Sequence, residues 1–515
     1  MKRRERVLLL FTGMVLLMLT VAQPAKAVIW FQDGRITWNG FVRETVFVRL
    51  NIPGDESRLH KSKIDYARTA LLTELLYKWI DEPDLAVNMF VSLKYWYEKA
   101  PWLDSDLKKA IPHRVYKDYV KPMDSDILTE LYVDIVKGNW QFTAGKQIVV
   151  WGETSILRTA DVINPLDLRL GTPGIDDWEY VKRGLWLLRA SYQTELPGNL
   201  SFEAIIIPGN YETMFIPQEG TMLGPGDTSF NQGHGFGIFH WVQEKNRRDA
   251  PGWSLRDNWE LGLRIRGYTW DMDWTLMYFN TLTDMGVAYP DRFNALGAQY
   301  VKAGLRSQIT GETINPGDWP QHTVFKRKRY QLIGGTAQTM IGSLNNMIAR
   351  LEWVYVIGDW YNKSPNGNNA GTYYDRVRRD SLNLALDMSQ VFNLPYVTHK
   401  WFNDKKLSVS CTLNYGKIFN HDGDLIVSSS RQQRPGDSHA FSVSYSFQQF
   451  FWHYKGMVML LGNFTGYKKY MTVPMLAYIP SDHWRYEVGW LMFGDRSHHA
   501  SDRTDRVMLR VRYEW

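Results

Sequence analysis

The sequence concentrates charges of both signs in one region, which begins with A-G-K-Q-I-V-V-W-G-E at Ala144–Glu153. From residue 154 to residue 183, acidic and basic side chains are interleaved with isoleucine, leucine and valine. Closely spaced opposite charges can select or bind a charged solute, and they can equally pair with one another. The side chains that we single out as candidates for a pore constriction are Lys146, Glu153, Arg158, Asp167 and Arg169.

Patterns for catalysis or metal binding are weak. The pairs His498/His499 and His234/His240 fall in predicted loops without a convincing third ligand, so no metal site is predicted. Neither G-x-S-x-G nor H-E-x-x-H occurs, and no glycine-rich stretch stands between a strand and a helix. The single cysteine, Cys411, excludes an internal disulfide and a C-x-x-C-H haem attachment. We predict no catalytic residue, cofactor or metal, and we keep a hydrolase as the least favoured alternative because serine and histidine are present.

Alternating apolar and polar residues recur along the chain and predict β-strands. The clearest strand ends the sequence, with Val507, Leu509, Val511, Tyr513 and Trp515 on one face and Arg510, Arg512 and Glu514 on the other. A transmembrane β-strand needs about 9–11 residues, apolar toward lipid and polar toward the lumen. We count about 18 such segments from Ile36 to Trp515, with about 16 as the alternative number.

The predicted connections alternate between short and long. Short ones include D-E-P-D, K-G-N, W-D-M-D and P-S-D, and long ones lie near Lys99–Asp126, Glu153–Arg183, Tyr211–Asp257 and Met285–Arg327. Asn393–Lys406 is an exception, because it is long where a short turn is expected. The alternation of short and long connections is typical of an outer-membrane barrel with short periplasmic turns and long extracellular loops. We therefore predict an all-β fold, a single transmembrane antiparallel β-barrel over residues 28–515.

The two ends of the chain indicate the compartment. Residues 1–27 combine a basic start, an apolar run and Ala25-Lys26-Ala27, which is the pattern of a cleaved signal peptide. The formal net charge of the whole sequence is +6, and residues 1–27 contribute +4 of it. The remaining chain is therefore nearly neutral, and its charge does not indicate binding to nucleic acid. We predict the bacterial outer membrane, with lipid and lipopolysaccharide as surroundings. The terminal strand ending at Trp515 would be recognised by the barrel-assembly machinery.

The strand alternation also predicts which charges face the lumen. The candidate lumen-wall residues are Arg68, Lys78, Arg189, Arg264, Arg266, Arg350, Glu352, Arg510 and Arg512. A basic wall would favour anions or carboxylated solutes. The alternative is a hydrated wall in which these charges pair with acidic neighbours.

One stretch also resembles a known family. K-G-N-W-Q-F-T-A-G-K-Q-I-V-V-W-G-E at Lys137–Glu153, followed by D-V-I-N-P-L-D at Asp161–Asp167, resembles the domain of unknown function 1302 of Gram-negative bacteria. Its members show a G-R/K-Q-x-x-x-W-G-E strand followed by an N-P-x-D loop. The resemblance implies an outer-membrane β-barrel, and some members lie in gene clusters with envelope exporters or hydrophobic-compound catabolism. It supplies no catalytic residues.

In a barrel, Lys146 does not fit the alternation of its strand. A lipid-facing charge at mid-membrane costs about 2–4 kcal/mol, so we expect a bulge near Gly145 that turns Lys146 inward. The apolar content of residues 153–183 favours a loop folded into the lumen as a constriction, with an ordinary surface loop as the alternative. We predict a porin-like channel for a small anionic or amphipathic solute. The alternative is a plugged barrel that serves a periplasmic, exporter or electron-transfer partner.

Overall fold

The computed structural model describes residues 34–50, 64–105, 108, 120–122, 124–154, 159–167, 178–209, 258–284, 287–290, 323–363, 375–393, 406–422, 425–428, 438–451, 454–465, 469–495 and 505–515. The predicted signal peptide, residues 1–27, lies outside these described residues. Within them, no helix is both long enough and apolar enough to cross a membrane.

The described chain is built almost entirely from strands. The strands are β1 (Ile36–Arg49), β2 (Ile64–Glu82), β3 (Leu85–Glu98), β4 (Leu128–Lys137), β5 (Trp140–Gln147), β6 (Leu185–Gln193), β7 (Ser201–Ile207), β8 (Glu260–Thr269), β9 (Met272–Leu282), β10 (Val287–Pro290), β11 (Thr323–Lys326), β12 (Arg329–Ile341), β13 (Met347–Lys363), β14 (Asp375–Asn393), β15 (Lys406–Ile418), β16 (Leu425–Ser428), β17 (His439–Phe451), β18 (Gly456–Thr465), β19 (Lys469–Ser481), β20 (Trp484–Asp495) and β21 (Arg506–Glu514). The short helices are α2 (Ala100–Leu103), α5 (Asp124–Ile127), α6 (Trp178–Val181) and the 3-10 turn η3 (Gly342–Leu344).

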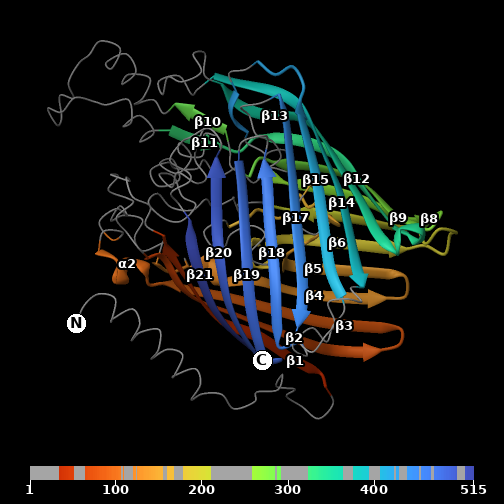
Figure 1. Ribbon diagram of the computed structural model, residues 1–515. Coiled ribbons are helices and arrows are strands. Elements are labelled where there is room, and N and C mark those ends of the chain that lie inside the picture. Colours follow the sequence, from red (N-terminus) through yellow and green to blue (C-terminus); the bar gives the residue numbers. More distant parts are fainter. Residues whose placement is uncertain are drawn as a thin grey trace, which may run out of the picture.

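Eighteen of these strands form one closed antiparallel barrel. Figure 1 shows how the strands are arranged around it. Each strand pairs with the next along the chain, β9 pairs with β12, and β15 pairs with β17. The barrel closes where Phe41–Arg49 of β1 pairs with Arg506–Glu514 of β21. The predicted fold class and strand number are confirmed. The remaining strands are accessory, because β10 pairs only with β11 and β16 adds a short ladder to β13.

The alternation of residue types fixes the two faces of the wall. On β8, Leu261 and Leu263 are 41% and 45% exposed, whereas Glu260 and Arg264, which flank them, are each 2% exposed. Successive side chains of a strand point to opposite faces, so the apolar set covers the outside and the charged set lies inside. The same arrangement recurs around the barrel, where Trp186, Leu188, Phe202, Leu276, Leu351, Phe441, Val458, Leu476 and Val488 are exposed.

The two ends of the barrel differ. One end, here called the turn end, carries the hairpins β2–β3, β4–β5, β8–β9 and β19–β20 (Figure 1). In the β8–β9 hairpin, Trp270 and Asp271 both have positive φ values, 54° and 55°, as a two-residue type I′ turn requires. The opposite end, here called the loop end, carries the long connections. The unexpectedly long Asn393–Lys406 connection joins β14 and β15 at the turn end, and residues 394–405 lie outside the described residues.

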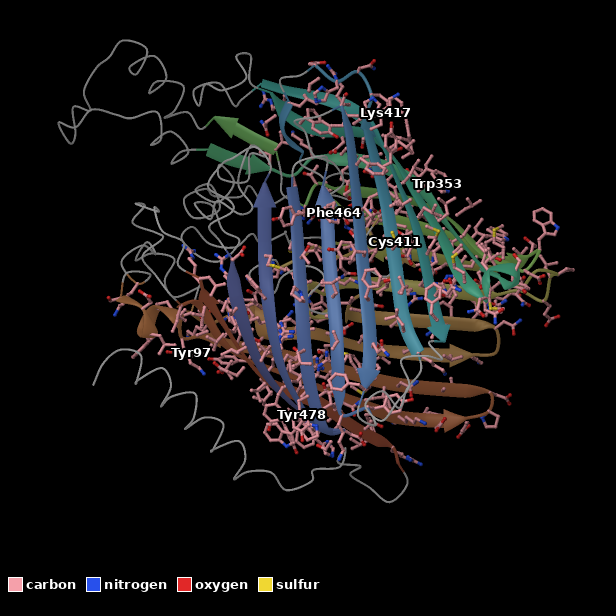
Figure 2. The ribbon with its side chains drawn as sticks, in the orientation of Figure 1. Tyr97, Trp353, Cys411, Lys417, Phe464 and Tyr478 are labelled. Carbon is pink, nitrogen blue, oxygen red and sulfur yellow. The ribbon has the colours of Figure 1, made fainter. Side chains whose placement is uncertain are left out.

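Aromatic side chains gather on the outer surface at the turn end. Trp484 and Tyr513 have ring centroids 4.8 Å apart, and Trp38 and Trp515 have centroids 5.9 Å apart. Tyr478, labelled in Figure 2, lies at the same end. The Trp515 indole lies where a Cβ would project from Gly40, so glycine is required beneath it. Such an aromatic cluster at one rim is typical of a barrel wall that meets a membrane interface.

The inner wall departs from the expected polar character on β18 and β19. There, M-V-M-L-L and M-T-V-P-M-L-A are apolar on both faces. Met457, Leu461, Val473 and Met475 point inward and are 5% exposed or less, in a cluster that also includes Met508 of β21. This side of the lumen is therefore lined by methionine and aliphatic side chains, whose mutual contacts replace hydration.

Candidate functional site

The connection between β5 and β6 packs on the inner wall. Its described residues, 148–154, 159–167 and 178–184, are here called the 148–184 segment. Trp151, Ala160 and Ile163 of this segment are 2% exposed or less. They form one apolar cluster with inward residues of β6, β7, β9, β12 and β13, namely Leu185, Leu187, Ile205, Ile207, Met277, Phe279, Tyr330, Leu332, Val354 and Val356. Burial of this surface stabilises the packed position.

Glu352 of β13 binds the backbone of the segment. Its Oε1 accepts the N–H of Glu153 and, at 2.7 Å, the N–H of Thr154. Its Oε2 accepts the N–H of Thr159 at 3.2 Å and of Ala160 at 2.7 Å. Four N–H donors offset the desolvation of this fully buried carboxylate, which is 0% exposed.

Glycine in the W-G-E motif allows this approach. A Cβ on Gly152 would stand 3.1 Å from Oε1 of Glu352 and 3.0 Å from Cβ of Asp161. These separations are shorter than ordinary van der Waals contact, so a side chain would push the carboxylate and the segment apart. The motif therefore combines an apolar anchor, a close backbone approach and an N–H donor in three consecutive residues.

Glu203 of β7 binds the tryptophan of the same motif. Its Oε1 accepts the indole N–H of Trp151 at 2.7 Å. Its Oε2 accepts from Arg189 at 2.6 Å and from Arg264 at 3.0 Å. The Arg264 guanidinium also lies over the Trp151 ring, 5.3 Å from the centroid. One carboxylate thus joins the segment to three neighbouring strands, β6, β7 and β8.

The N-P-x-D motif holds the two halves of the segment together. The buried Asn164 side chain accepts the N–H of Val149 at 2.7 Å and donates to the carbonyls of Gln147 at 3.1 Å and Arg183 at 2.8 Å. The Arg183 N–H donates to Pro165 O at 2.8 Å, and the Asp167 N–H donates to Val181 O at 2.6 Å. The resulting short ladder ties the start of the segment to its return.

A buried ion pair reinforces this ladder. Lys182 Nζ lies 2.8 Å from Oδ2 of Asp161, and the two side chains are 1% and 5% exposed. Arg183, next along the chain, lies 2.9 Å from Asp126 of α5. The ends of the segment are therefore fixed both to each other and to the connection that precedes β4.

The expected bulge at Gly145 takes a different form. β5 pairs with β4 and β6 without a register shift, and Gly145 has φ of +137°, a conformation open to glycine. Lys146 is 6% exposed and donates to Leu128 O at 2.7 Å. It lines a small cavity together with Lys94, Asp167 and Lys182. The sharp backbone change at Gly145 thus accommodates two adjacent buried polar residues, Lys146 and Gln147.

The far end of the segment reaches the opposite wall. Tyr180 of α6 packs on Phe41 of β1 with ring centroids 5.9 Å apart, and the Arg43 guanidinium lies 4.6 Å from the Tyr180 centroid. Lys94 of β3 donates to Tyr180 O at 2.7 Å. In the strand order of the barrel, β1 and β13 stand almost opposite each other. The segment therefore makes contacts across the width of the lumen.

The structure describes only some of the residues that the sequence predicts at a pore constriction. Lys146 and Asp167 line the same small cavity, whereas the Glu153 side chain is exposed and its backbone binds Glu352. Arg158 and Arg169 lie outside the described residues.

Most predicted lumen-wall charges have acidic neighbours. The ion pairs are Arg68–Glu98 at 3.2 Å, Lys78–Asp81 at 3.3 Å, Arg189–Glu203 at 2.6 Å, Arg264–Glu203 at 3.0 Å, Arg350–Asp387 at 2.9 Å, Arg510–Glu487 at 3.3 Å and Arg512–Glu514 at 2.6 Å. Arg266 is exposed and forms no hydrogen bond or ion pair within the described residues. The wall is thus largely charge-paired where it is described.

Several residues of this site were not identified from the sequence. Trp151 was recognised only as part of a motif, and Glu203 and Lys94 were not singled out. One signal existed for Glu203, because it is the only charge in the otherwise apolar strand S-F-E-A-I-I-I. Within the described residues, no group of three or more histidine, cysteine or acidic side chains could hold a metal ion.

The fold and site define a class, a closed 18-strand antiparallel barrel whose 148–184 segment packs on the inner wall. The chain belongs to the family described as "Protein of unknown function (DUF1302)", whose profile matches residues 8–515. No match was found among functionally curated proteins.

Several solved structures are similar to the chain at low sequence identity. Acinetobacter baumannii OccAB3 has 9% identity and a TM-score of 0.47, with 93% of this chain and 99% of that chain covered. Pseudomonas aeruginosa OccK1 (OpdK) has 8% identity and a TM-score of 0.44, with 93% and 98% covered. A Salmonella typhi OmpF complex with daunomycin has 10% identity and a TM-score of 0.40, with 94% and 99% covered.

Proposed function

We propose that the chain is a bacterial outer-membrane channel for small solutes, narrowed by the 148–184 segment. The main support for this proposal is a pair of buried carboxylates, Glu203 and Glu352, which bind this segment to the inner wall. A surface loop would gain nothing from such anchors. A segment that must keep a passage at constant width needs them, because an unanchored loop would fluctuate across it.

The outer surface supports placement in a membrane. Its exposed leucine, phenylalanine and tryptophan side chains suit a hydrocarbon environment, and the aromatic cluster around Trp484 and Trp515 suits one interface. We place the turn end at the periplasm and the loop end outside, in contact with lipopolysaccharide. The β21 strand ending at Trp515 is the proposed recognition element for barrel assembly.

The solute that we propose is amphipathic rather than simply anionic. Arginines that would attract anions are paired with carboxylates, as in Arg350–Asp387 and Arg510–Glu487. The inner wall of β18 and β19 is apolar, with Met457 and Met475 in its cluster. A solute with both polar and apolar parts fits such a lining better than a small hydrated anion.

The apolar inner wall also favours a second candidate function. An apolar surface facing a lumen is stable when something covers it, so the barrel could instead be filled and act through a periplasmic, exporter or electron-transfer partner. The two candidates differ in a single measurable property, which is ion conductance.

Single-channel recording in planar bilayers tests the proposal. The mature protein is compared with a variant that lacks residues 154–182 and with a control that lacks residues 215–243, an equally long piece of the β7–β8 connection. We expect stable current steps from the intact protein and larger steps only when 154–182 is removed. Absence of conductance in all three proteins, despite heat-modifiable folding on gels, would refute the channel and favour the filled barrel.

A further inference from the structure

A second cavity lies between the barrel wall and the 148–184 segment. Its volume is about 440 Å³. The wall side is formed by β1–β4 and β21, and the other side by Ile148 and Tyr180 of the segment. This volume falls within the range of about 300–1,000 Å³ that is usual for small-molecule sites. The cavity adjoins the small space around Lys146 and Asp167, with which it shares Lys94 and Thr129.

Two carboxylates with few partners face this cavity. Glu130 of β4 accepts one hydrogen bond, from the Ile148 N–H at 2.8 Å. Glu74 of β2 forms no hydrogen bond or ion pair within the described residues. Both side chains are partly buried, so their charges are only partly hydrated. A cation placed in the cavity would therefore meet acceptors that the protein itself leaves available.

The two basic side chains that line the same cavity, Lys94 and Arg512, contact other residues of its lining. Lys94 donates to Tyr180 O at 2.7 Å. Arg512 lies 4.2 Å from the centroid of the Phe41 ring and 2.6 Å from Oε1 of Glu514. The Tyr180 carbonyl leaves the Lys94 charge in place, but the lining holds three carboxylates, Glu74, Glu130 and Glu514, against these two cations. The cavity is therefore acidic by one charge, and Glu74 and Glu130 are its carboxylates without an ion pair within the described residues.

The rest of the lining is apolar. Phe41, Leu72 and Ile148 contribute aromatic and aliphatic surface, and Tyr180 closes the cavity from the segment side. Phe41 and Tyr180 are 4% and 3% exposed, so they are held in place by packing and present a fixed surface. A hydrocarbon or aromatic body would be desolvated here while its charged group reached the carboxylates.

We propose that this cavity is a binding subsite for amphipathic organic cations, in which an ammonium group contacts Glu74 and Glu130 and an apolar body packs on Phe41, Leu72 and Ile148. The inference rests on the proposed passage of solutes, and it names the chemical class of solute that would bind beside the 148–184 segment.

Calorimetric titration of the folded barrel in detergent tests the subsite directly. The probes are phenethylammonium, phenethyl alcohol and hydrocinnamate, which share one aromatic body and are cationic, neutral and anionic. The variants are the double substitution Glu74→Gln with Glu130→Gln and the control Glu82→Gln, which removes an exposed carboxylate in the β2–β3 turn. Glutamine at position 130 keeps a carbonyl acceptor for the Ile148 N–H.

We expect the wild-type barrel to bind the ammonium about tenfold or more tightly than the alcohol, since charge-assisted contacts exceed neutral ones by this order. The double variant should lose the preference and the control should keep it. Equal binding of ammonium and alcohol, tighter binding of hydrocinnamate, or an unchanged preference in the double variant would overturn the subsite. If the double variant fails to fold, Glu74→Gln alone, which breaks no contact within the described residues, should weaken ammonium binding.

Conductance recorded on the same preparations separates this inference from the proposed channel. Conductance without an ammonium preference would overturn the subsite and leave the channel standing. An ammonium preference that depends on Glu74 and Glu130, in a barrel without conductance, would support the subsite and refute the channel.

Discussion

Replacing Glu352 by glutamine should loosen the 148–184 segment without altering the barrel wall. The wild-type carboxylate accepts four backbone N–H groups, two on each oxygen. Glutamine keeps one oxygen and replaces the other with an NH2 group, which donates and does not accept. Two N–H groups would then face another donor. The change is nearly isosteric, so packing against β13 should be preserved.

The size of the effect follows from the number of bonds lost. A hydrogen bond to a charged group contributes about 1.5–3 kcal/mol. At the lower value, the loss of two costs about 3 kcal/mol in the anchored state. Because about 1.4 kcal/mol corresponds to a tenfold change in an equilibrium constant, the detached state should become about a hundredfold more populated.

Two assays read this change. Amide hydrogen exchange at Thr159 and Ala160, followed by mass spectrometry, should become about a hundredfold faster, because exchange requires detachment. Single-channel records should show brief visits to a larger current. Glu487→Gln is the control, since it removes an inner-wall carboxylate that pairs with Arg510. Unchanged exchange and unchanged current levels in Glu352→Gln would refute the anchoring role.

Three further substitutions probe the same architecture. Gly145→Ala should lower the urea midpoint of barrel unfolding by an amount corresponding to about 1–3 kcal/mol or more, since φ is +137° and the new Cβ would overlap Leu131 O. Asn164→Asp should accelerate amide exchange in the segment, because it removes two donors to backbone carbonyls at about 1–3 kcal/mol each. Glu203→Ala should destabilise the barrel by about 3–5 kcal/mol in urea, because Arg264 would remain buried without its carboxylate.

Each substitution has a matched control in an exposed turn. Gly342→Ala places a Cβ at an ordinary contact distance of 4.0 Å from Asn346 Oδ1, Asn199→Asp changes a turn residue, and Glu195→Ala removes an exposed carboxylate. These three variants should behave as the unmodified protein does. If the control variants change the unfolding midpoint or the amide exchange rate as much as the buried substitutions do, the effects do not depend on the contacts of Gly145, Asn164 and Glu203. The roles assigned to these contacts would then be refuted.

The barrel itself could be predicted because its signal is local. Each strand carries its own two-residue alternation, as Leu261, Leu263 and Ile265 show against Glu260 and Arg264. The short turns and long connections then fix the direction of successive strands. The alternation failed where the lumen wall is itself apolar, on β18 and β19, because burial by neighbouring methionines removes the need for polar residues there.

The site was harder to predict because its contacts are distant in sequence. Lys146 was recognised as misplaced, yet the solution adopted at Gly145 is a single unusual φ rather than a shift in register. Glu352 was assigned to the lumen wall only from its position in the alternation of apolar and polar residues along its strand. Nothing in the sequence connects it to Glu153, which precedes it by 199 residues. The partner of Trp151, Glu203, was missed for the same reason.

The long-range anchors also constrain the order in which the protein can assemble. The 148–184 segment follows the fifth strand, but its Glu352 acceptor belongs to β13, and the Arg510–Thr45 contact that seals the wall joins residues 465 apart. Pairings so far apart in the chain form slowly, because a large loop must first be closed. The Glu352 anchor can therefore form only after β13 has reached its place, whereas the contacts of the segment with β6 and β7 need only strands that are close in sequence.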